Sequence, residues 1–379
     1  MNILYLYDNF PAYRKDFFSQ LSHKLEARGH KFSLVYLETT NASVQSNRSD
    51  VDFVAIPCPD GSIQVGGLFT LKYFKGFKNV LKSQKPDVVV LQFHTAILTY
   101  WWLLLYVKTH RIPYVIWECG FIRDTLKSWL VRFRQALVIC TFKMSSVCIC
   151  YGTHLRKYII SKGKDPKDVI VAQNTINVEK LMKERSVTCA NRTFDHPIHF
   201  LYVGALIHRK YVLPSVEAIA ELIEEGQDIF YDIVGKGDEY ERIQSFIESR
   251  KLGDRIVLHG AKHGAEVKPF FENCDVFLLP GTGGLAINEA MAYCMPIIST
   301  TGDDTVPDLI DGNGFLLKSF GDKAEIKKTI SNFLTQSNAA KTAMAIRSEE
   351  ILRTKATLDN MTNQHIVGLE RAMLKRYGK

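Results

Sequence analysis

The stretch VFLLPGTGGLAINEAMAYCMPII, residues 276–298, decides the fold class. The apolar run 276–279 lacks polar alternation, which is typical of a parallel strand covered on both faces. Gly281, Gly283 and Gly284 form a turn, an apolar helical pattern follows, and Pro296 precedes the next apolar run. A strand, a glycine-rich loop, a helix and a second strand in this order predict a parallel α/β sheet.

The same alternation of strands and helices extends over the whole chain. Apolar runs predicted as strands lie at residues 3–7, 32–36, 52–56, 88–91, 114–117, 147–150, 198–203, 230–234, 256–258 and 297–300. Helical patterns between them are clearest at residues 14–28, followed by Gly29, and at residues 214–225, which we expect to begin with Pro214 at the first helical position. The alternation predicts an α/β protein with two doubly wound, Rossmann-like domains.

The domain boundaries follow from a loss of periodicity at residues 184–197, which we interpret as a linker. We expect an N-terminal domain at residues 1–185, a C-terminal domain at residues 198–355, and a final segment, 356–379, whose helix at residues 358–374 packs back on the first domain.

Charge and composition narrow the classes of function. The chain has 379 residues and a net charge of +8, with 24 Lys and Arg against 13 Asp and Glu in residues 1–180 and 24 against 27 in the remainder. The basic half suits a phosphate-bearing substrate or an anionic membrane surface, and no motif for nucleic-acid binding accompanies it. The longest apolar stretch, 95–107, is too short for a membrane span. With no secretory signal, we expect a cytoplasmic protein, and without zinc-like Cys and His spacing we expect no metal.

Two loops at strand ends have the residues of an anion-binding site. The glycines at 281, 283 and 284, with Thr282 and Leu285 between and after them, let a ligand approach the amides at a helix N-terminus, and Glu289 one turn later could accept hydrogen bonds from ribose hydroxyls. After the strand 198–203, Gly204 leads to the adjacent cations Arg209 and Lys210, while Gly235 follows the next strand. The alternatives are turn glycines with a solvated glutamate, and two solvated loop charges.

In this order and spacing, these elements resemble the retaining GT-B glycosyltransferases of the group-1 family, glycosyltransferase family 4, of the bacterial surface-polysaccharide type. The family's V-G-R-L-x-x-x-K-G loop reads VGALIHRKY at residues 203–211, which keeps Lys210 and lacks the arginine. Its E-x7-E element has Glu289 as the second glutamate and Gly281 in place of the first. Because the first glutamate contacts the transferred sugar in the family, Gly281 puts that contact in question.

The resemblance implies transfer of a sugar, with retention, from a nucleotide-diphosphate sugar to a glycan or polyprenyl-diphosphate-linked acceptor. The nucleotide sugar is then a co-substrate, and no cofactor is expected. Lys210 and Arg209 would stabilise the leaving diphosphate, and Glu118 at the end of the strand 114–117 would act on the acceptor side. The donor would be bound by Gly204, Gly235, Gly281, Thr282, Gly283, Gly284, Leu285 and Glu289.

Several alternatives remain at this stage. The chain could be a sugar-nucleotide epimerase of the same fold, or a non-catalytic transferase-like scaffold subunit. Glu118 could pair with Arg123 as a structural carboxylate, and His94 and His154 could each be a site residue, although an isolated histidine is more often structural. The helix at residues 123–143 interleaves cations with an apolar stripe, which predicts peripheral contact with the inner face of an anionic membrane unless the stripe packs inside the domain.

Overall fold

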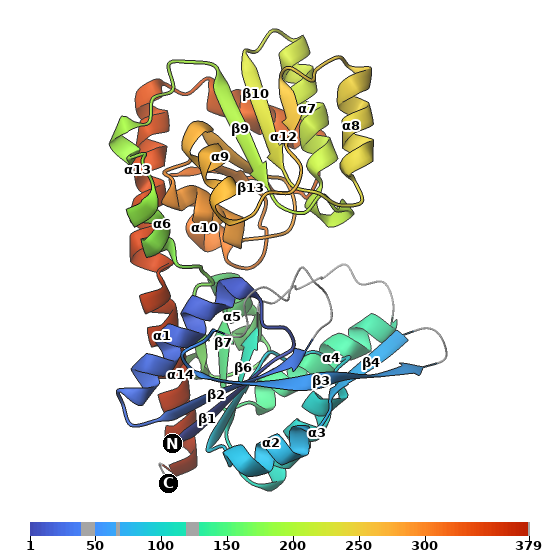
Figure 1. Cartoon of the computed structure of the whole chain (residues 1–379), viewed down its shortest axis with the longest axis vertical. Helices are drawn as coiled ribbons and strands as arrows, with labels where there is room; N and C mark the ends of the chain where they lie inside the picture. The colour runs from blue at the N-terminus through green and yellow to red at the C-terminus, as the bar shows by residue number, and fades with distance from the viewer. Residues whose placement is uncertain (39–49, 66–68, 119–128, 378–379) are drawn as a thin grey trace. The chain divides into compact units, whose positions relative to one another are not determined.

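The computed structural model describes residues 1–38, 50–65, 69–118 and 129–377. The chain forms two compact units, residues 1–173 with 358–379 and residues 174–357. Figure 1 shows the layered α/β arrangement of each unit. Among the described residues, no helix is long and apolar enough to cross a membrane.

The first unit is built on an eight-stranded sheet in the order β4-β3-β2-β1-β5-β6-β7-β8. All neighbours are parallel except β3 and β4, which form an antiparallel hairpin. The strands are β1 (Asn2–Tyr7), β2 (Lys31–Glu38), β3 (Val54–Val65), β4 (Phe69–Phe74), β5 (Val88–Leu91), β6 (Tyr114–Glu118), β7 (Val147–Cys150) and β8 (Val169–Val171). The helices are α1 (Lys15–Glu26), α2 (Phe77–Gln84), α3 (Leu98–Thr109), α4 (Trp129–Met144), α5 (Thr153–Ser161) and α14 (Leu358–Tyr377).

Burial on both faces explains why the strands lack polar alternation. Ile3, Tyr5 and Tyr7 of β1 pack in a core with α1 and α14, while Leu4 and Leu6 pack in a second core with α2, α3 and α5. A sheet covered on both sides needs apolar residues at every strand position.

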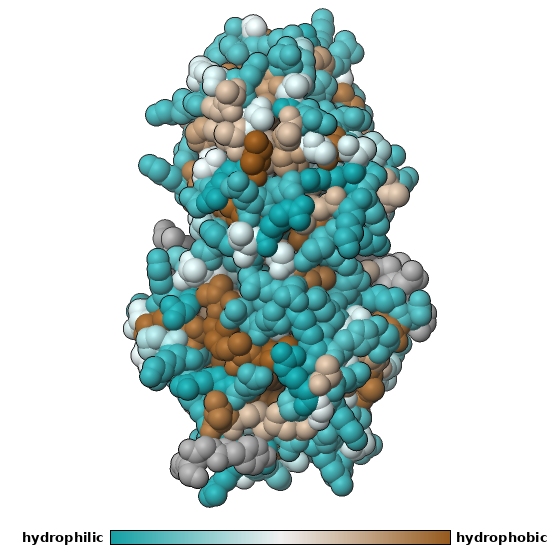
Figure 2. All heavy atoms as spheres, turned by 90° about the vertical axis from the view of Figure 1, so that its left-hand side faces the viewer, coloured by the Kyte–Doolittle hydropathy of each residue, from teal (hydrophilic) through white to brown (hydrophobic). Residues whose placement is uncertain are grey.

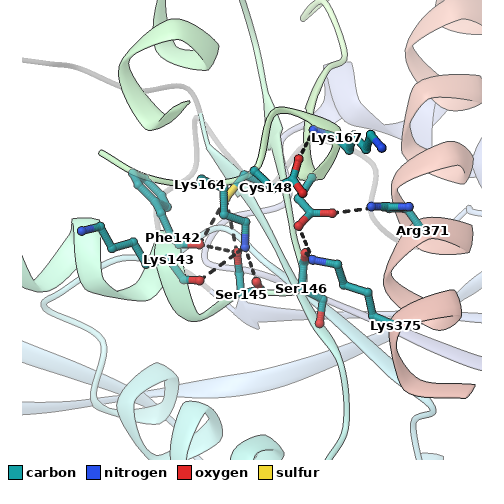
Figure 3. Close-up of polar contacts among 11 residues, drawn as sticks. Phe142, Lys143, Ser145, Ser146, Cys148, Lys164, Lys167, Arg371 and Lys375 are labelled. Atoms are coloured by element: carbon teal, nitrogen blue, oxygen red, sulfur yellow. Dashed lines mark hydrogen bonds and ion pairs between the residues drawn. The ribbon is translucent and has the colours of Figure 1, made fainter. Parts of the chain in front are cut away.

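The C-terminal helix α14 belongs to the first unit, although residues 174–357 precede it in the chain. His365 of α14 is fully buried, and its Nδ1 lies 3.0 Å from the hydroxyl of Tyr5. Figure 3 shows Arg371 and Lys375 reaching from α14 into a polar cluster, where both donate to the buried carboxylate of Asp168. The outer face of α14 leaves apolar side chains in water, and Figure 2 shows such side chains gathered on this side of the unit.

A buried lysine closes the C-terminal end of α4 in the same cluster. Lys164 is 7% exposed, and its Nζ donates to the carbonyl oxygens of Lys143 and Ser145 (Figure 3). A cation is favourable there because the last carbonyls of a helix have no partner within the helix. Burial lowers the pKa of Lys164. This cluster therefore has a structural role in holding α4 against the sheet.

The second unit contains a six-stranded parallel sheet in the order β11-β10-β9-β12-β13-β14. Its strands are β9 (Ile198–Val203), β10 (Ile229–Val234), β11 (Ile256–Leu258), β12 (Val276–Leu279), β13 (Ile297–Ser299) and β14 (Gly314–Leu316). Its helices are α6 (Val178–Glu184), α7 (Val212–Glu224), α8 (Tyr240–Ser249), α9 (Lys268–Asn273), α10 (Leu285–Ala292), α11 (Val306–Leu309), α12 (Lys323–Leu334) and α13 (Asn338–Lys355).

The structure differs from the sequence-based expectation at the linker. Residues 184–197 belong to the second unit, which begins at Asn174. Cys189 and Phe194 lie in its core, and the buried Arg192 donates to three backbone carbonyls, those of Phe271, Cys274 and Tyr293. The segment lacks periodicity because it is largely exposed and is anchored by only three buried side chains, those of Cys189, Arg192 and Phe194.

Smaller differences concern individual elements. The strand expected at residues 52–56 begins at Val54 and continues to Val65, and β4, β8 and β14 were not predicted. Helix α7 begins at Val212, so Pro214 occupies the third helical position and not the first. That position tolerates proline because the first amides of a helix have no acceptor within it. Cys189 and Cys294 form a disulfide that the sequence did not indicate.

Candidate donor-binding site

A short 3₁₀ helix positions the two adjacent cations of the predicted site. Strand β9 ends at Val203, and the 3₁₀ helix η4 (His208–Lys210) follows at the carboxyl edge of the sheet. Tyr211 then takes a left-handed conformation with φ of 51°, which turns the chain directly into α7. Ligands of open α/β sheets bind at this edge.

The glycine-rich loop after β12 docks on this 3₁₀ helix. The Thr282 amide donates to the Arg209 carbonyl at 3.2 Å, and the Thr282 hydroxyl donates to the same oxygen. Gly281 is buried, and a Cβ on it would lie 2.3–2.5 Å from the Lys210 backbone. The two loops approach so closely that position 281 excludes any side chain. The first glutamate of the family pattern therefore has no place in this arrangement.

Lys210 is held half-buried over the glycine-rich loop. Its Nζ donates to the carbonyl oxygen of Thr282, and a Cβ on Gly283 would lie 2.7 Å from that nitrogen. Burial, together with the charge of Arg209, lowers the pKa of Lys210 to about 8, against the attraction of Asp303. Arg209 itself is exposed, with Nη1 3.5 Å from the Thr282 hydroxyl. An anion bound here would restore the preference of Lys210 for its charged form.

The loop after β13 supports the glycine-rich loop from the other side. The Thr300 hydroxyl donates to the Gly281 carbonyl at 2.9 Å, and the Asp303 amide donates to the Gly283 carbonyl at 3.1 Å. A Cβ on Gly284 would lie 2.4–2.6 Å from the Asp303 carboxylate. Sequence reasoning missed Thr300 and Asp303. Their place directly after a parallel strand next to β12 was the available signal.

Glu289 lies on α10, whose N-terminus follows the glycine-rich loop, beginning at Leu285. Its carboxylate is half-buried, and among the described residues it has no hydrogen-bond or ion-pair partner. Burial raises the pKa of Glu289 to about 7. A carboxylate that is desolvated without a partner is available to accept hydrogen bonds from a ligand, which distinguishes it from a glutamate on a solvated face.

Gly204 and Gly235 allow the loops after β9 and β10 to pack tightly. The Gly204 amide donates to the Val234 carbonyl at 3.0 Å, and a Cβ on Gly235 would lie 1.9 Å from the Gly204 carbonyl oxygen. Gly237 is equally constrained against the Leu206 backbone. These glycines shape the floor of the site through their backbone.

The acceptor-side candidates lie at the carboxyl edge of the first sheet. Glu118 is the last residue of β6, and its side chain lies outside the described residues. His94 follows β5 and is exposed, and Asp8 follows β1. Burial raises the pKa of Asp8, an effect opposed by the nearby charges of His94 and Lys72. Asp8 and His94 thus follow neighbouring strands, β1 and β5, of the same sheet. His154 is an exposed residue of α5.

Among the described residues, one group of three potential metal ligands was found, at Cys189, Cys294 and Glu349. The two sulfur atoms are bonded to each other, and Arg185 pairs with the Glu349 carboxylate at 2.6 Å. A disulfide offers no thiolate to a metal, so this donor set does not fit the zinc chemistry of cysteine.

Curated relatives and solved structures resemble parts or nearly all of this chain. WcaL of Escherichia coli (strain K12), a protein named for colanic acid biosynthesis, is 28% identical over 189 residues, 47% of this chain and 45% of WcaL. The amylovoran biosynthesis glycosyltransferase AmsK of Erwinia amylovora is 29% identical over 181 residues, 45% of this chain and 42% of AmsK. The chain therefore aligns with less than half the length of these curated relatives. The structure of Anabaena HepE with UDP and glucose superimposes with a TM-score of 0.70 at 15% identity, covering 98% of this chain and 99% of HepE.

Two family models match successive parts of the chain. Residues 16–175 match the glycosyl transferase 4-like domain, and residues 188–349 match the glycosyl transferases group 1. The likeness to solved structures establishes the two-domain GT-B fold over nearly the whole chain. With one match in each unit, the chain belongs to the group 1 glycosyltransferase family.

Proposed function

We propose that the chain is a glycosyltransferase that moves a sugar, with retention, from a nucleotide-diphosphate sugar to a glycan or lipid-linked glycan acceptor in cell-surface polysaccharide biosynthesis. The observation that carries this proposal is the position of Lys210. It is a half-buried cation held over the glycine-rich loop, and that loop leads directly into the N-terminus of α10. The names of AmsK and WcaL support a role in polysaccharide assembly.

Electrostatic stabilisation of the leaving group is the main chemical task of this site. When the bond between the anomeric carbon and the diphosphate oxygen breaks, its electron pair stays on the diphosphate, and positive charge develops on the sugar. Lys210, Arg209 and the amides that begin α10 would face the growing negative charge. Fixed donors aimed at developing charge supply a large part of such catalysis.

The bond to the acceptor completes the reaction. The acceptor hydroxyl oxygen bonds to the anomeric carbon as the bond to the diphosphate breaks, and the hydroxyl proton passes to the oxygen of the leaving diphosphate. Glu118, at the end of β6, and Asp8, whose burial raises its pKa, are the carboxyl groups we assign to the acceptor side. In this proposal, Glu289 accepts hydrogen bonds from hydroxyls of the donor, and no metal takes part.

Peripheral association with an anionic membrane is part of the same proposal. Trp129 and Phe133 of α4 are 72% and 59% exposed, and the exposed cations Arg132 and Arg134 lie between and beside them. These aromatic side chains do not pack inside the unit. An apolar surface bordered by cations is typical of helices that lie on anionic lipid.

Calorimetry with a panel of nucleotide diphosphates, followed by assays of sugar transfer, tests the proposal. We expect one nucleotide diphosphate to bind the wild-type chain, and Lys210→Ala to lower the turnover of the matching nucleotide sugar by about 10²-fold or more. Gly253→Ala, at a position with open space around the glycine, is a matched control for folding. Failure of every nucleotide diphosphate to bind would instead favour the scaffold alternative.

A further inference from the structure

A cavity of about 610 Å³ opens in the first unit. It lies between β4 and the adjoining helices α2 and α3, with part of β3 on one side. Its volume is within the ~300–1,000 Å³ range of ligand pockets. Its lining residues are Ile63, Tyr73, Phe74, Lys75, Gly76, Phe77, Lys78, Asn79, Leu98, Thr99 and Trp102.

The walls of this cavity are apolar and largely aromatic. Phe74 and Phe77 are each 3% exposed, and the rings of Phe77 and Trp102 meet edge to face at 6.1 Å. The hydroxyl of Thr99 is already engaged, because it accepts a hydrogen bond from the Phe74 amide at 2.9 Å. The interior thus suits a hydrocarbon more than a sugar, which would lose hydrogen bonds on entering.

Two lysines without ion-pair partners among the described residues lie at the rim. Lys75 and Lys78 are exposed, and Nζ of Lys78 lies 5.5 Å from the centre of the Trp102 ring. A ligand for this cavity should therefore carry an anionic group next to an apolar chain. The apolar surface continues outside the cavity along α3, where Leu105 is 62% exposed, so a longer chain would find further contacts there.

We propose that this cavity binds the hydrocarbon chain of a polyprenyl-type lipid diphosphate, with the diphosphate held at the rim by Lys75 and Lys78. The assignment of this lipid to the acceptor rests on the proposed function, while binding of an amphiphilic diphosphate does not. Hydrophobic burial supplies the affinity for the chain, and the lysines select lipids with a charged head over neutral ones.

Calorimetric titration of the whole protein with farnesyl diphosphate, kept below its micellar concentration, tests this inference. Farnesol and inorganic diphosphate serve as probes of the two halves of the ligand. We expect farnesyl diphosphate to bind at least about tenfold more tightly than either, which corresponds to about 1.4 kcal/mol. Equal affinity for inorganic diphosphate would indicate a simple phosphate site and would overturn the inference, as would absence of binding.

Matched variants locate the binding. Lys78→Glu should weaken farnesyl diphosphate about tenfold or more, whereas Lys82→Glu, one turn later on α2 and outside the cavity, should not. Ile63→Asp, in the half-exposed wall, should weaken both farnesyl diphosphate and farnesol, whereas Leu105→Asp on the open face of α3 should not. If both variants of either pair lost the same affinity for farnesyl diphosphate, the binding would be non-specific and the assignment to the cavity would be overturned.

Titration of the same preparations with the nucleotide diphosphate separates this inference from the proposed function. Nucleotide binding should be unchanged in Lys78→Glu and Ile63→Asp. If no nucleotide binds while farnesyl diphosphate binds as expected, the proposed function fails and the lipid site stands. If nucleotide binds and farnesyl diphosphate does not, the lipid site fails and the proposed function stands.

Discussion

At position 281 the backbone of Lys210 occupies the space that a side chain would need. The glutamate of the family pattern would have its Cβ 2.3 Å from the Lys210 carbonyl oxygen, far closer than two non-bonded atoms can approach. The loss of that glutamate is thus coupled to the close docking of the two loops. Under the proposed function, any contact with the transferred sugar would come from other residues of the candidate site.

Restoring the family residue should therefore damage this chain. We expect Gly281→Glu to destabilise the second unit by about 1–3 kcal/mol, the cost of forcing a side chain into a packed region, and to weaken nucleotide-diphosphate binding. Urea unfolding and calorimetry measure the two effects, with Gly253→Ala as the control. Unchanged stability with higher turnover would mean that the loops separate readily and accept the glutamate.

Glu289 and Lys210 together should give a narrow pH optimum. In the proposed function, donor binding uses the Glu289 carboxylate, whose pKa is raised to about 7, and leaving-group stabilisation uses the Lys210 ammonium, whose pKa is lowered to about 8. We expect kcat/KM to rise as the pH increases through about 7 and to fall above about 8. Glu289→Gln should remove the rising limb, and Lys210→Arg should move the falling limb to higher pH. A wild-type profile that is flat between pH 6 and 9 would contradict both assignments.

The raised pKa of Glu289 also means that its carboxylate destabilises the folded state when no ligand is bound. Because its pKa is higher in the folded state than in the unfolded chain, the folded state binds more protons between about pH 4.5 and 7, and stability falls as the pH rises through that range. Glu289→Gln should therefore be more stable than the wild type at pH 8, although it binds the donor less well. Greater stability with weaker binding is the combination expected of a ligand-binding residue.

Among the elements, α14 depends on a charge cluster as well as on apolar packing. The Asp168 carboxylate is 3% exposed and accepts hydrogen bonds from Arg371 and Lys375 of α14. Burial alone would raise the pKa of Asp168, but these hydrogen bonds lower it overall. The charged form therefore stabilises the fold above the unfolded pKa of about 3.8, and this contribution is lost as the pH falls through the lower folded value.

Removing the Asp168 charge should loosen the attachment of α14. We expect Asp168→Asn to lower the free energy of unfolding by about 1.5–3 kcal/mol at pH 7, the range for hydrogen bonds to charged groups. Glu370→Gln, which removes an exposed charge of the same helix that lies 4.0 Å from Arg28, is the control for loss of a weak surface ion pair. The difference from the wild type should shrink below about pH 4, and equal unfolding curves at pH 7 would show that apolar packing alone holds the helix.

Helix α4 provides the element-level test of membrane contact. We expect the protein to sediment with vesicles that contain anionic lipid and to be released in about 0.5 M salt, where electrostatic attraction is short-ranged. Trp129→Ser with Phe133→Ser should weaken this binding without loss of stability, because both side chains are largely exposed. The exposed Ile346 of α13 offers a control substitution in the second unit. Absence of binding to anionic vesicles at low salt would overturn the assignment.

For the whole molecule, the two units divide charge unequally. The first unit has 27 Lys and Arg against 14 Asp and Glu, a net +13, and the second has 21 against 26, a net −5. The asymmetry is larger than the division after residue 180 indicates, because residues 358–379 add a net charge of +2 to the first unit. The basic unit is thus the one suited to phosphate-bearing acceptors and anionic surfaces.

Because the two units have separate hydrophobic cores, we expect a bound nucleotide to stabilise mainly the unit that binds it. At about 100 times its dissociation constant, a nucleotide diphosphate should stabilise the second unit by about 2.7 kcal/mol. Hydrogen exchange should slow first in residues 204–211 and 281–289, which form the candidate site. Protection that begins in residues 1–173 instead would place the nucleotide in the other unit.

Sequence alone determined the alternation of strands and helices and the two-domain α/β class, because parallel strands buried on both faces need continuous apolar runs. The runs at 88–91, 147–150, 198–203, 256–258 and 276–279 coincide with strands of the structure. Lys210, Glu289 and the glycines were recognisable from local spacing, since short loops at strand ends carry their own signal.

Only the tertiary structure decided which distant residues meet. The packing of Gly281 on Lys210, the burial that shifts the pKa of Glu289, the disulfide between Cys189 and Cys294, and the cavity beside Trp102 all depend on contacts between segments far apart in sequence. Residues 184–197 are anchored to the second unit by side chains whose partners are elsewhere in the chain, which local periodicity does not record. Local patterns record the conformation of a segment, whereas burial and charge environment arise when segments pack together.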